Sequence, residues 1–402
     1  MIVNPPKAID AVGQQHPMPR ELTISVVESA LDEKAGVEHE GDQDGKSREI
    51  EPFDPTLIRI ETRNYTVYLI LRRIAEDEIE LQPDFQRMGG IWDDGKQSRL
   101  IESMMLRIPL PAFYVDASTE NKWIVIDGLQ RLTAMNRFMN LGELKLRDLE
   151  FLQEHNGKTF DELPRALQRR LEETPLMLYL VQSGTPHKVK FNIFKRINTG
   201  GMPLSGQEIR HALNQGPATS LLAELARSQE FQTAVDGGVS PMRMTDRECV
   251  LRFLAFKLRS PIEYKSRDDL DSFLNDRMQQ INLLGIEDRS LLSKLRDDFK
   301  RAMLAARRIF GNQAFRKYFP RERRRSQVSK ALFEVWSVNL DKLSDKEIDQ
   351  LIARKRQLMQ KWAKLMDDNE FMNAISYSTG DSRRVRYRFR KVSDIIQETL
   401  CA

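Results

Sequence analysis

The stretch Trp123–Asn140, which reads WIVIDGLQRLTAMNRFMN, constrains the fold more than any other part of the chain. An apolar run, Ile124–Ile126, ends at Asp127-Gly128, and a helical pattern of apolar residues follows at once. A strand, a tight glycine turn and a helix in this order bring backbone N–H groups and the positive end of a helix dipole to one point. The sequence therefore predicts a strand–turn–helix unit with a candidate anion site at its turn.

Two interpretations of this turn remain open. Gln130 and Arg131 lie in the first helical turn, where the guanidinium could hold a phosphate with two parallel hydrogen bonds. Asp127 and Gln130 also have the spacing of a capping box, in which Asp127 caps the helix and Gln130 reaches back. The two roles are compatible, because capping leaves Arg131 available.

The bulk composition indicates a globular protein. With 402 residues, 40% of them hydrophobic and 30% charged, the chain is long enough for two or three domains. We find no apolar run as long as a membrane span and no secretory signal. The two cysteines, Cys249 and Cys401, are too few for a disulfide framework or a structural zinc site. We expect a protein of the reducing cytoplasm without membrane association.

The hydrophobic patterning divides the chain into three parts. Residues 1–54 lean acidic and lack sustained periodicity, so we expect a disordered segment. Residues 55–215 mix helical patterns with strand candidates at Ala112–Val115 and Leu176–Val181. Residues 216–402 have nearly only helical spacing. The predicted fold class is α+β, with a mixed N-terminal domain followed by an all-helical C-terminal domain.

Three polar clusters interrupt the apolar pattern of the mixed domain, each at a turn beside a helix. Their Arg, Gln, Asn and closely spaced Gly residues could wrap a triphosphate with guanidinium groups, carboxamides and backbone N–H donors. No single cluster is specific, but three in this order are more so. The clusters are Pro83-Asp84-Phe85-Gln86-Arg87, Asp127-Gly128-Leu129-Gln130-Arg131 and Arg196-Ile197-Asn198-Thr199-Gly200-Gly201.

In this order the clusters resemble the N-terminal domain family of GmrSD-type modification-dependent restriction endonucleases. That family carries an Asp-Gly-Gln-Gln-Arg signature and has a fold similar to the ParB/sulfiredoxin-like domain. The resemblance covers about residues 64–213. It implies a domain that binds, and in several members hydrolyses, nucleoside triphosphates within an antiphage restriction system.

The resemblance also implies roles for residues of all three clusters. Asp127 would handle water or Mg²⁺, and Arg131 would hold phosphate charge. The resemblance does not identify the base of the nucleotide. The other residues implied in the site are Gln130 in the catalytic turn and, for nucleotide binding, Gln86, Arg87, Gly128, Asn198, Thr199 and Gly200.

Two departures from the family pattern weaken hydrolysis more than binding. Leu129 stands where the signature has Gln. Ile197 stands where ParB-type CTP-binding proteins have an acid before the residue equivalent to Asn198. Two alternatives therefore remain: a non-enzymatic DNA-binding adaptor or clamp that nucleotide locks as a dimer, and a metal-dependent nuclease in which Asp84, Asp127 and Glu208 would converge.

Many family members fuse this domain to a C-terminal HNH-type nuclease, which needs clustered histidines around a metal. The five histidines of this chain are scattered, and none lies beyond His211. The helical half is therefore not expected to be that nuclease. If the system cuts nucleic acid, either the mixed domain or a partner chain does so. A nuclease or ATPase partner chain and a homo-oligomer are further expectations.

Two arginine-rich stretches, Arg316–Arg325 and Arg383–Lys391, are candidates for DNA contact. If the second stretch is extended, its arginines face one side and its apolar residues face the other. The alternative is a solvated helix start whose arginines pair with nearby acids. The candidate phosphate contacts are Arg323, Arg324, Arg384, Arg386, Arg388 and Arg390, and the apolar residues behind the last four are Val385, Tyr387 and Phe389.

Overall fold

The computed structural model describes most of the chain. The described residues are Asp32 and the ranges 35–40, 57–81, 92–119, 122–197, 204–265, 269–321 and 325–402. Most of the segment predicted to be disordered, residues 1–54, lies outside them. Residues 35–40 are an exception, because they are described and pack into the helical region, whose residues come much later in the sequence.

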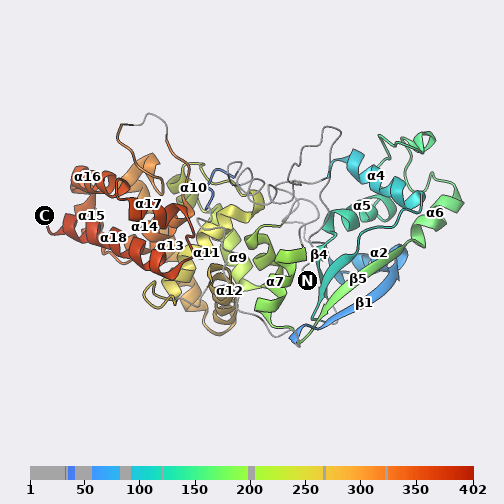
Figure 1. Ribbon diagram of the computed structural model, residues 1–402, viewed down its shortest axis with the longest axis horizontal. Coiled ribbons are helices and arrows are strands. Elements are labelled where there is room, and N and C mark those ends of the chain that lie inside the picture. The colour runs from blue at the N-terminus through green and yellow to red at the C-terminus, as the bar shows by residue number, and fades with distance from the viewer. Residues whose placement is uncertain are drawn as a thin grey trace, which may run out of the picture.

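A five-stranded mixed sheet organises the first region (Figure 1). Its order is β1-β5-β3-β4-β2, in which β1–β5 and β3–β4 are antiparallel and β5–β3 and β4–β2 are parallel. The short apolar runs predicted β3, β4 and β5, whereas β1 was missed because most of its side chains are exposed. The strands are β1 (Ile60–Thr66), β2 (Ile79–Glu80), β3 (Phe113–Ala117), β4 (Trp123–Asp127) and β5 (Pro175–Gln182).

Helices cover both faces of this sheet. Alternation along β5 sends Leu178 and Leu180 into the larger core, whereas Val181 points into a smaller core on the other face. The larger core contains residues of α2 (Val67–Ala75), α4 (Asp94–Met105), α5 (Leu129–Met139) and α6 (Arg165–Glu172), with η2 (Gln153–His155) between α5 and α6 in the chain. The smaller core contains residues of α7 (His187–Ile197) and α8 (Gly206–Leu213).

The rest of the described chain is helical, and at its centre α14 is buried on all sides. The predicted fold class, α+β with a mixed region followed by helices, is confirmed. None of the described helices is both long and apolar enough to cross a membrane. The helices are α9 (Pro217–Arg227), α10 (Gln229–Val235), η3 (Met242–Met244), α11 (Thr245–Leu258), α12 (Leu270–Glu287), α13 (Arg289–Phe310), η4 (Gly311–Gln313), α14 (Lys330–Asp341), α15 (Asp345–Ala353), α16 (Lys355–Met366), α17 (Asn369–Ser376) and α18 (Ser382–Leu400).

The stretch Arg383–Lys391 is part of α18 and not extended, so the extended alternative is wrong. The Asp381 side chain caps the helix by accepting hydrogen bonds from the backbone N–H groups of the second and third residues after it. The apolar pattern also continues beyond the stretch with helical spacing, which a nine-residue window cannot reveal. The buried apolar residues of α18 are Val385, Phe389, Val392, Ile395 and Ile396.

Candidate functional site

The turn between β4 and α5 requires glycine at its centre. Gly128 is the N-cap residue of α5 and has a φ of 95°, in the left-handed region that glycine adopts without strain. A Cβ on Gly128 would lie 2.2 Å from Cδ1 of Phe113. The turn therefore depends on Gly128 for both its backbone conformation and its fit against β3.

The predicted capping box does not form. Within the described residues, no side chain caps the N-terminus of α5. Asp127 ends β4 and binds Arg131 instead, and Oε1 of Gln130 accepts a hydrogen bond of 3.2 Å from the backbone N–H of Trp92. The N–H groups of the first turn of α5 thus lack a side-chain cap, an arrangement that suits an anion.

Arg131 holds the turn against the start of β3. Its guanidinium donates to the carbonyls of Pro111 and Ala112, the latter at 3.2 Å, and to Oδ2 of Asp127 at 2.9 Å. It also lies 4.3 Å from the centre of the Phe113 ring. Burial lowers the pKa of Arg131 against the opposing effect of Asp127. These contacts make Arg131 first of all a residue that orders the turn.

Asp127 is the carboxylate of this turn, and about a third of its side chain (35%) is exposed. One carboxylate together with phosphate oxygens is a common way to hold Mg²⁺, so the residues present fit a magnesium triphosphate. Tyr114 is the register partner of Asp127 on β3 and stacks on Tyr179 with ring centres 4.8 Å apart. Sequence analysis missed both tyrosines, although they lie in strand candidates next to the turn.

The other two polar clusters cannot be placed in the site. The predicted residues Gln86, Arg87, Asn198, Thr199 and Gly200 lie outside the described residues. Their flanks nevertheless approach the turn. After the first cluster, the described chain resumes at Trp92, whose backbone N–H donates to Gln130. Helix α7 ends just before Asn198 and packs with Ile126 of β4 in the smaller core.

The nuclease alternative gains little from the geometry. Asp84 lies outside the described residues, and Glu208 serves the N-terminus of α8. Oε2 of Glu208 accepts from the backbone N–H of Ser205 at 2.6 Å, and it lies 3.5 Å from Nε of Arg243. Across the described ranges, no three His, Cys, Asp or Glu side chains are grouped so that they could hold a metal ion.

The arginines of the two arginine-rich stretches differ in burial and in their partners. Arg388 is fully buried and donates to Glu334, at 3.1 Å from Nε, so it is not available to a phosphate and this corrects the sequence prediction for it. Arg384 is half-buried and donates to a backbone carbonyl, that of Tyr377, at 2.6 Å. Arg386 and Arg390 are exposed and share one face of α18. Arg323 and Arg324 lie outside the described part of the chain.

These features define a class of protein. Its members have an α+β domain with a glycine turn at a helix N-terminus, joined to a large helical region. Residues 70–214 match the family described as GmrSD restriction endonuclease, N-terminal domain. This part of the chain is therefore similar to the N-terminal domain of that family. No curated protein and no solved structure matches the chain.

Proposed function

We propose that the chain is a cytoplasmic protein that binds a nucleoside triphosphate with Mg²⁺ and hydrolyses it slowly. In this proposal the nucleotide state shifts the contact of the helical region with DNA or with a nuclease partner. The observation that carries it is the N-terminus of α5, which begins at a left-handed Gly128 without a side-chain cap, inside the domain that matches the family.

Each residue of the turn has a distinct part in the proposed reaction. The N–H groups of the first turn of α5 bind phosphate oxygens, and Gly128 lets the backbone approach them closely. Bound Mg²⁺ would neutralise phosphate charge and orient the triphosphate. Asp127 would hold the metal or orient the attacking water, and Arg131 positions Asp127 through their 2.9 Å hydrogen bond. Leu129 and Ile197 favour slow turnover, since both depart from the family pattern.

The proposal is tested by thermal unfolding of the full chain with ATP, GTP, CTP and UTP in the presence of Mg²⁺, followed by phosphate release for any nucleotide that stabilises it. We expect one nucleotide or more to raise the unfolding temperature, because a ligand that binds only the folded state stabilises it. Asp127→Asn should keep most of this shift and lose phosphate release.

A matched control is Asp161→Asn, which neutralises an exposed aspartate of the same domain. It should bind and hydrolyse nucleotide like the wild type. The proposal fails if no nucleotide stabilises the wild-type chain. If the wild-type chain binds nucleotide tightly without releasing phosphate, hydrolysis is excluded and the nucleotide-locked clamp is the function that stays.

A DNA-binding adaptor is the second candidate function, and a specific feature of α18 favours it. Arg383, Arg386 and Arg390 follow one another at spacings of three and four residues and are all exposed. Arg390 lies over the ring of Tyr387 at 5.7 Å, which leaves its guanidinium at the surface. We call these three residues the α18 arginine row. A row of permanent charges along one helix face suits the phosphates of DNA.

A further inference from the structure

Residues 35–40, which we call the strap, dock in the helical region beside α10, with Ala35 and Gly36 in a turn and Val37 in a β-bridge (Figure 1). The backbone N–H of Ser240 donates to the carbonyl of Ala35 at 2.8 Å, and that of Glu38 donates to the carbonyl of Val328 at 2.9 Å. Val37 forms a parallel bridge with Val328, whose other side pairs with Arg316. The strap thus joins the helical region through an isolated β-bridge, with backbone hydrogen bonds like those of an added strand.

The groove that receives the strap selects the size of its side chains. Val37 and Ala35 are buried in the main helical core, with 0% and 1% exposure. Between them, Gly36 has a φ of 77°, and a Cβ there would lie 2.5 Å from the carbonyl oxygen of Gly238. The groove therefore accepts a small residue, then glycine, then valine, and excludes a side chain at the middle position.

The strap ends in a buried ion pair. Both carboxylate oxygens of Glu40 accept from the guanidinium of Arg252, at 2.9 and 2.6 Å. The side chain of Arg252 is 2% exposed and also binds Glu248 and Glu334. Burial opposes the charge of Glu40, yet Arg252 and Lys330 hold its pKa below the ordinary value.

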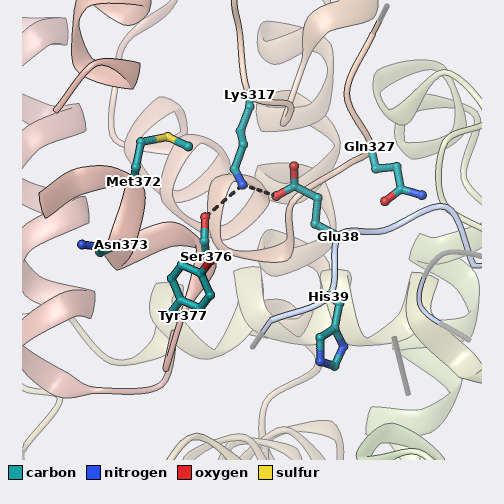
Figure 2. Close-up of a pocket in the computed structure, with 8 residues that line it drawn as sticks. All are labelled: Glu38, His39, Lys317, Gln327, Met372, Asn373, Ser376 and Tyr377. Carbon is teal, nitrogen blue, oxygen red and sulfur yellow. Dashed lines mark hydrogen bonds and ion pairs between the residues drawn. The ribbon is translucent and has the colours of Figure 1, made fainter. Parts of the chain in front are cut away.

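Two further acids of this segment meet bases of the helical region. Figure 2 shows the amine of Lys317 between Glu38, at 3.0 Å, and the hydroxyl of Ser376, at 2.9 Å. Asp32, just ahead of the strap, lies 3.7 Å from Lys330. Beside the Glu38–Lys317 pair is an open cavity of about 410 Å³, lined by Glu38, His39, Lys317, Gln327, Met372, Asn373, Ser376 and Tyr377.

The contacts of the strap are separable from those that hold the helices together. Its described backbone bonds to the helical region involve Ser240 and Val328. Without Glu40, Arg252 would still have Glu248 at 2.9 Å and Glu334 at 3.3 Å as anionic partners. The groove and its charges therefore come from the helical region, and the strap fills them as a ligand would.

We infer that the helical region contains a peptide-binding groove for a short acidic segment of the pattern Ala-Gly-Val-Glu-x-Glu, and that the strap of the same chain occupies it as a displaceable ligand. Valine supplies the apolar anchor, and the two glutamates meet Lys317 and Arg252. A segment that precedes the sheet in sequence is thereby tied to the helical region.

The test uses the full chain with a disabled strap, Val37→Asp with Glu40→Ala, and a labelled peptide that spans residues 30–42. We expect saturable binding of the peptide to this variant and an increase in its unfolding temperature. The wild-type chain should bind the peptide at least tenfold more weakly, because its own strap fills the groove. A disabled chain that is folded but does not bind the peptide overturns the inference, and one that cannot fold does so too, since the strap is then an integral part of the core.

A matched control peptide carries Gly36→Ala, a change of one methyl group. The short distance to Gly238 predicts that it binds at least about tenfold more weakly than the native peptide, which corresponds to about 1.4 kcal/mol. Equal binding of the two peptides would show association without the groove. A second test is the chain with Val37→Cys, Val328→Cys and Cys401→Ser, in which oxidation should lock the strap and abolish the remaining weak peptide binding, and reduction should restore binding to the wild-type level.

Discussion

Two buried charge sites, one in each region of the molecule, hold their charged side chains in different ways. In the sheet region, Glu102 accepts hydrogen bonds from three successive backbone N–H groups, those of residues 150–152, and Arg131 donates to two backbone carbonyls. At the site in the helical region, buried charged side chains bind one another: Arg252 contacts Glu40, Glu248 and Glu334.

The two kinds of interaction hold different parts of the structure in place. A charge that binds backbone groups fixes one loop or one turn, such as the turn before α5. A network of side chains joins segments that are far apart in sequence: Glu40 of the strap, Glu248 and Arg252 of α11, Glu334 of α14 and Arg388 of α18. The buried pair of Lys190 and Asp116 lies in the sheet region and joins α7 to β3, so the type of interaction follows the segments that it joins and not the region.

The largest effect is expected from Arg252→Met. It removes the cation that three buried carboxylates share, and breaking a buried pair by removing one partner costs about 3–5 kcal/mol. Urea unfolding measures this loss. The control is Arg296→Met, which breaks a partly exposed pair with Glu224 and should cost less than about 1 kcal/mol. Equal losses in the two variants would mean that the network does not hold the segments together.

A smaller and local effect is expected from Glu102→Ala. It leaves three backbone N–H groups without their acceptor, and an unsatisfied buried group costs about 1–3 kcal/mol unless water reaches it. Amide hydrogen exchange should accelerate at residues 150–152 and stay unchanged in α14. Faster exchange throughout the chain would show that backbone-bound charges also hold the whole molecule, which would break the comparison.

The same carboxylate predicts a pH dependence. Burial disfavours the charge of Glu102, but the backbone N–H donors prevail and hold its pKa below the ordinary value of 4.5. A lowered pKa in the folded state gives stability that is present above pH 4.5 and is lost as the pH falls through the folded-state pKa. The difference in unfolding free energy between wild type and Glu102→Gln should therefore shrink below pH 4.5. A difference that stays constant down to pH 3 would contradict this role.

How far the sequence predicts the molecule depends on the sequence distance between partners. The turn at Gly128 was predicted because strand, glycine and helix are adjacent in sequence. The prediction of a capping box was wrong because Asp127 binds Arg131, which in turn is held by the backbone just before β3. The network around Arg252 could not be predicted, since Glu40 lies 212 residues from it and Glu334 lies 82 residues from it.

The strap and α18 also show that sequence patterns do not predict contacts between distant segments. Residues 35–40 are short and polar, so their composition is typical of a linker, and only the groove around Val328 explains why they are ordered. In α18, the alternating arginines left an extended and a helical alternative open, and the structure shows the helix. The burial of Arg388 depends on Glu334 of another helix. The two tyrosines beside Asp127 could have been found by aligning the strand candidates, since Tyr114 and Tyr179 are register partners.

The smallest effect on stability is expected where charge in the helical region is exposed. Arg386→Ala with Arg390→Ala should leave the unfolding free energy unchanged, because neither side chain is buried. If the α18 arginine row binds DNA, each lost phosphate contact reduces the slope of log affinity against log salt concentration by about one, so the double variant should lose about two. Fluorescence anisotropy with duplex DNA between about 50 and 200 mM salt measures both quantities.

The control for this measurement is Arg165→Ala with Arg169→Ala, which removes two exposed arginines from α6 of the sheet region. It should keep the wild-type slope. An unchanged slope in the α18 variant would exclude the row as the DNA contact. A reduced slope with unchanged stability would complete the comparison: in the helical region the buried arginines hold the fold, and exposed arginines on the same helix as Arg388 are left for phosphate.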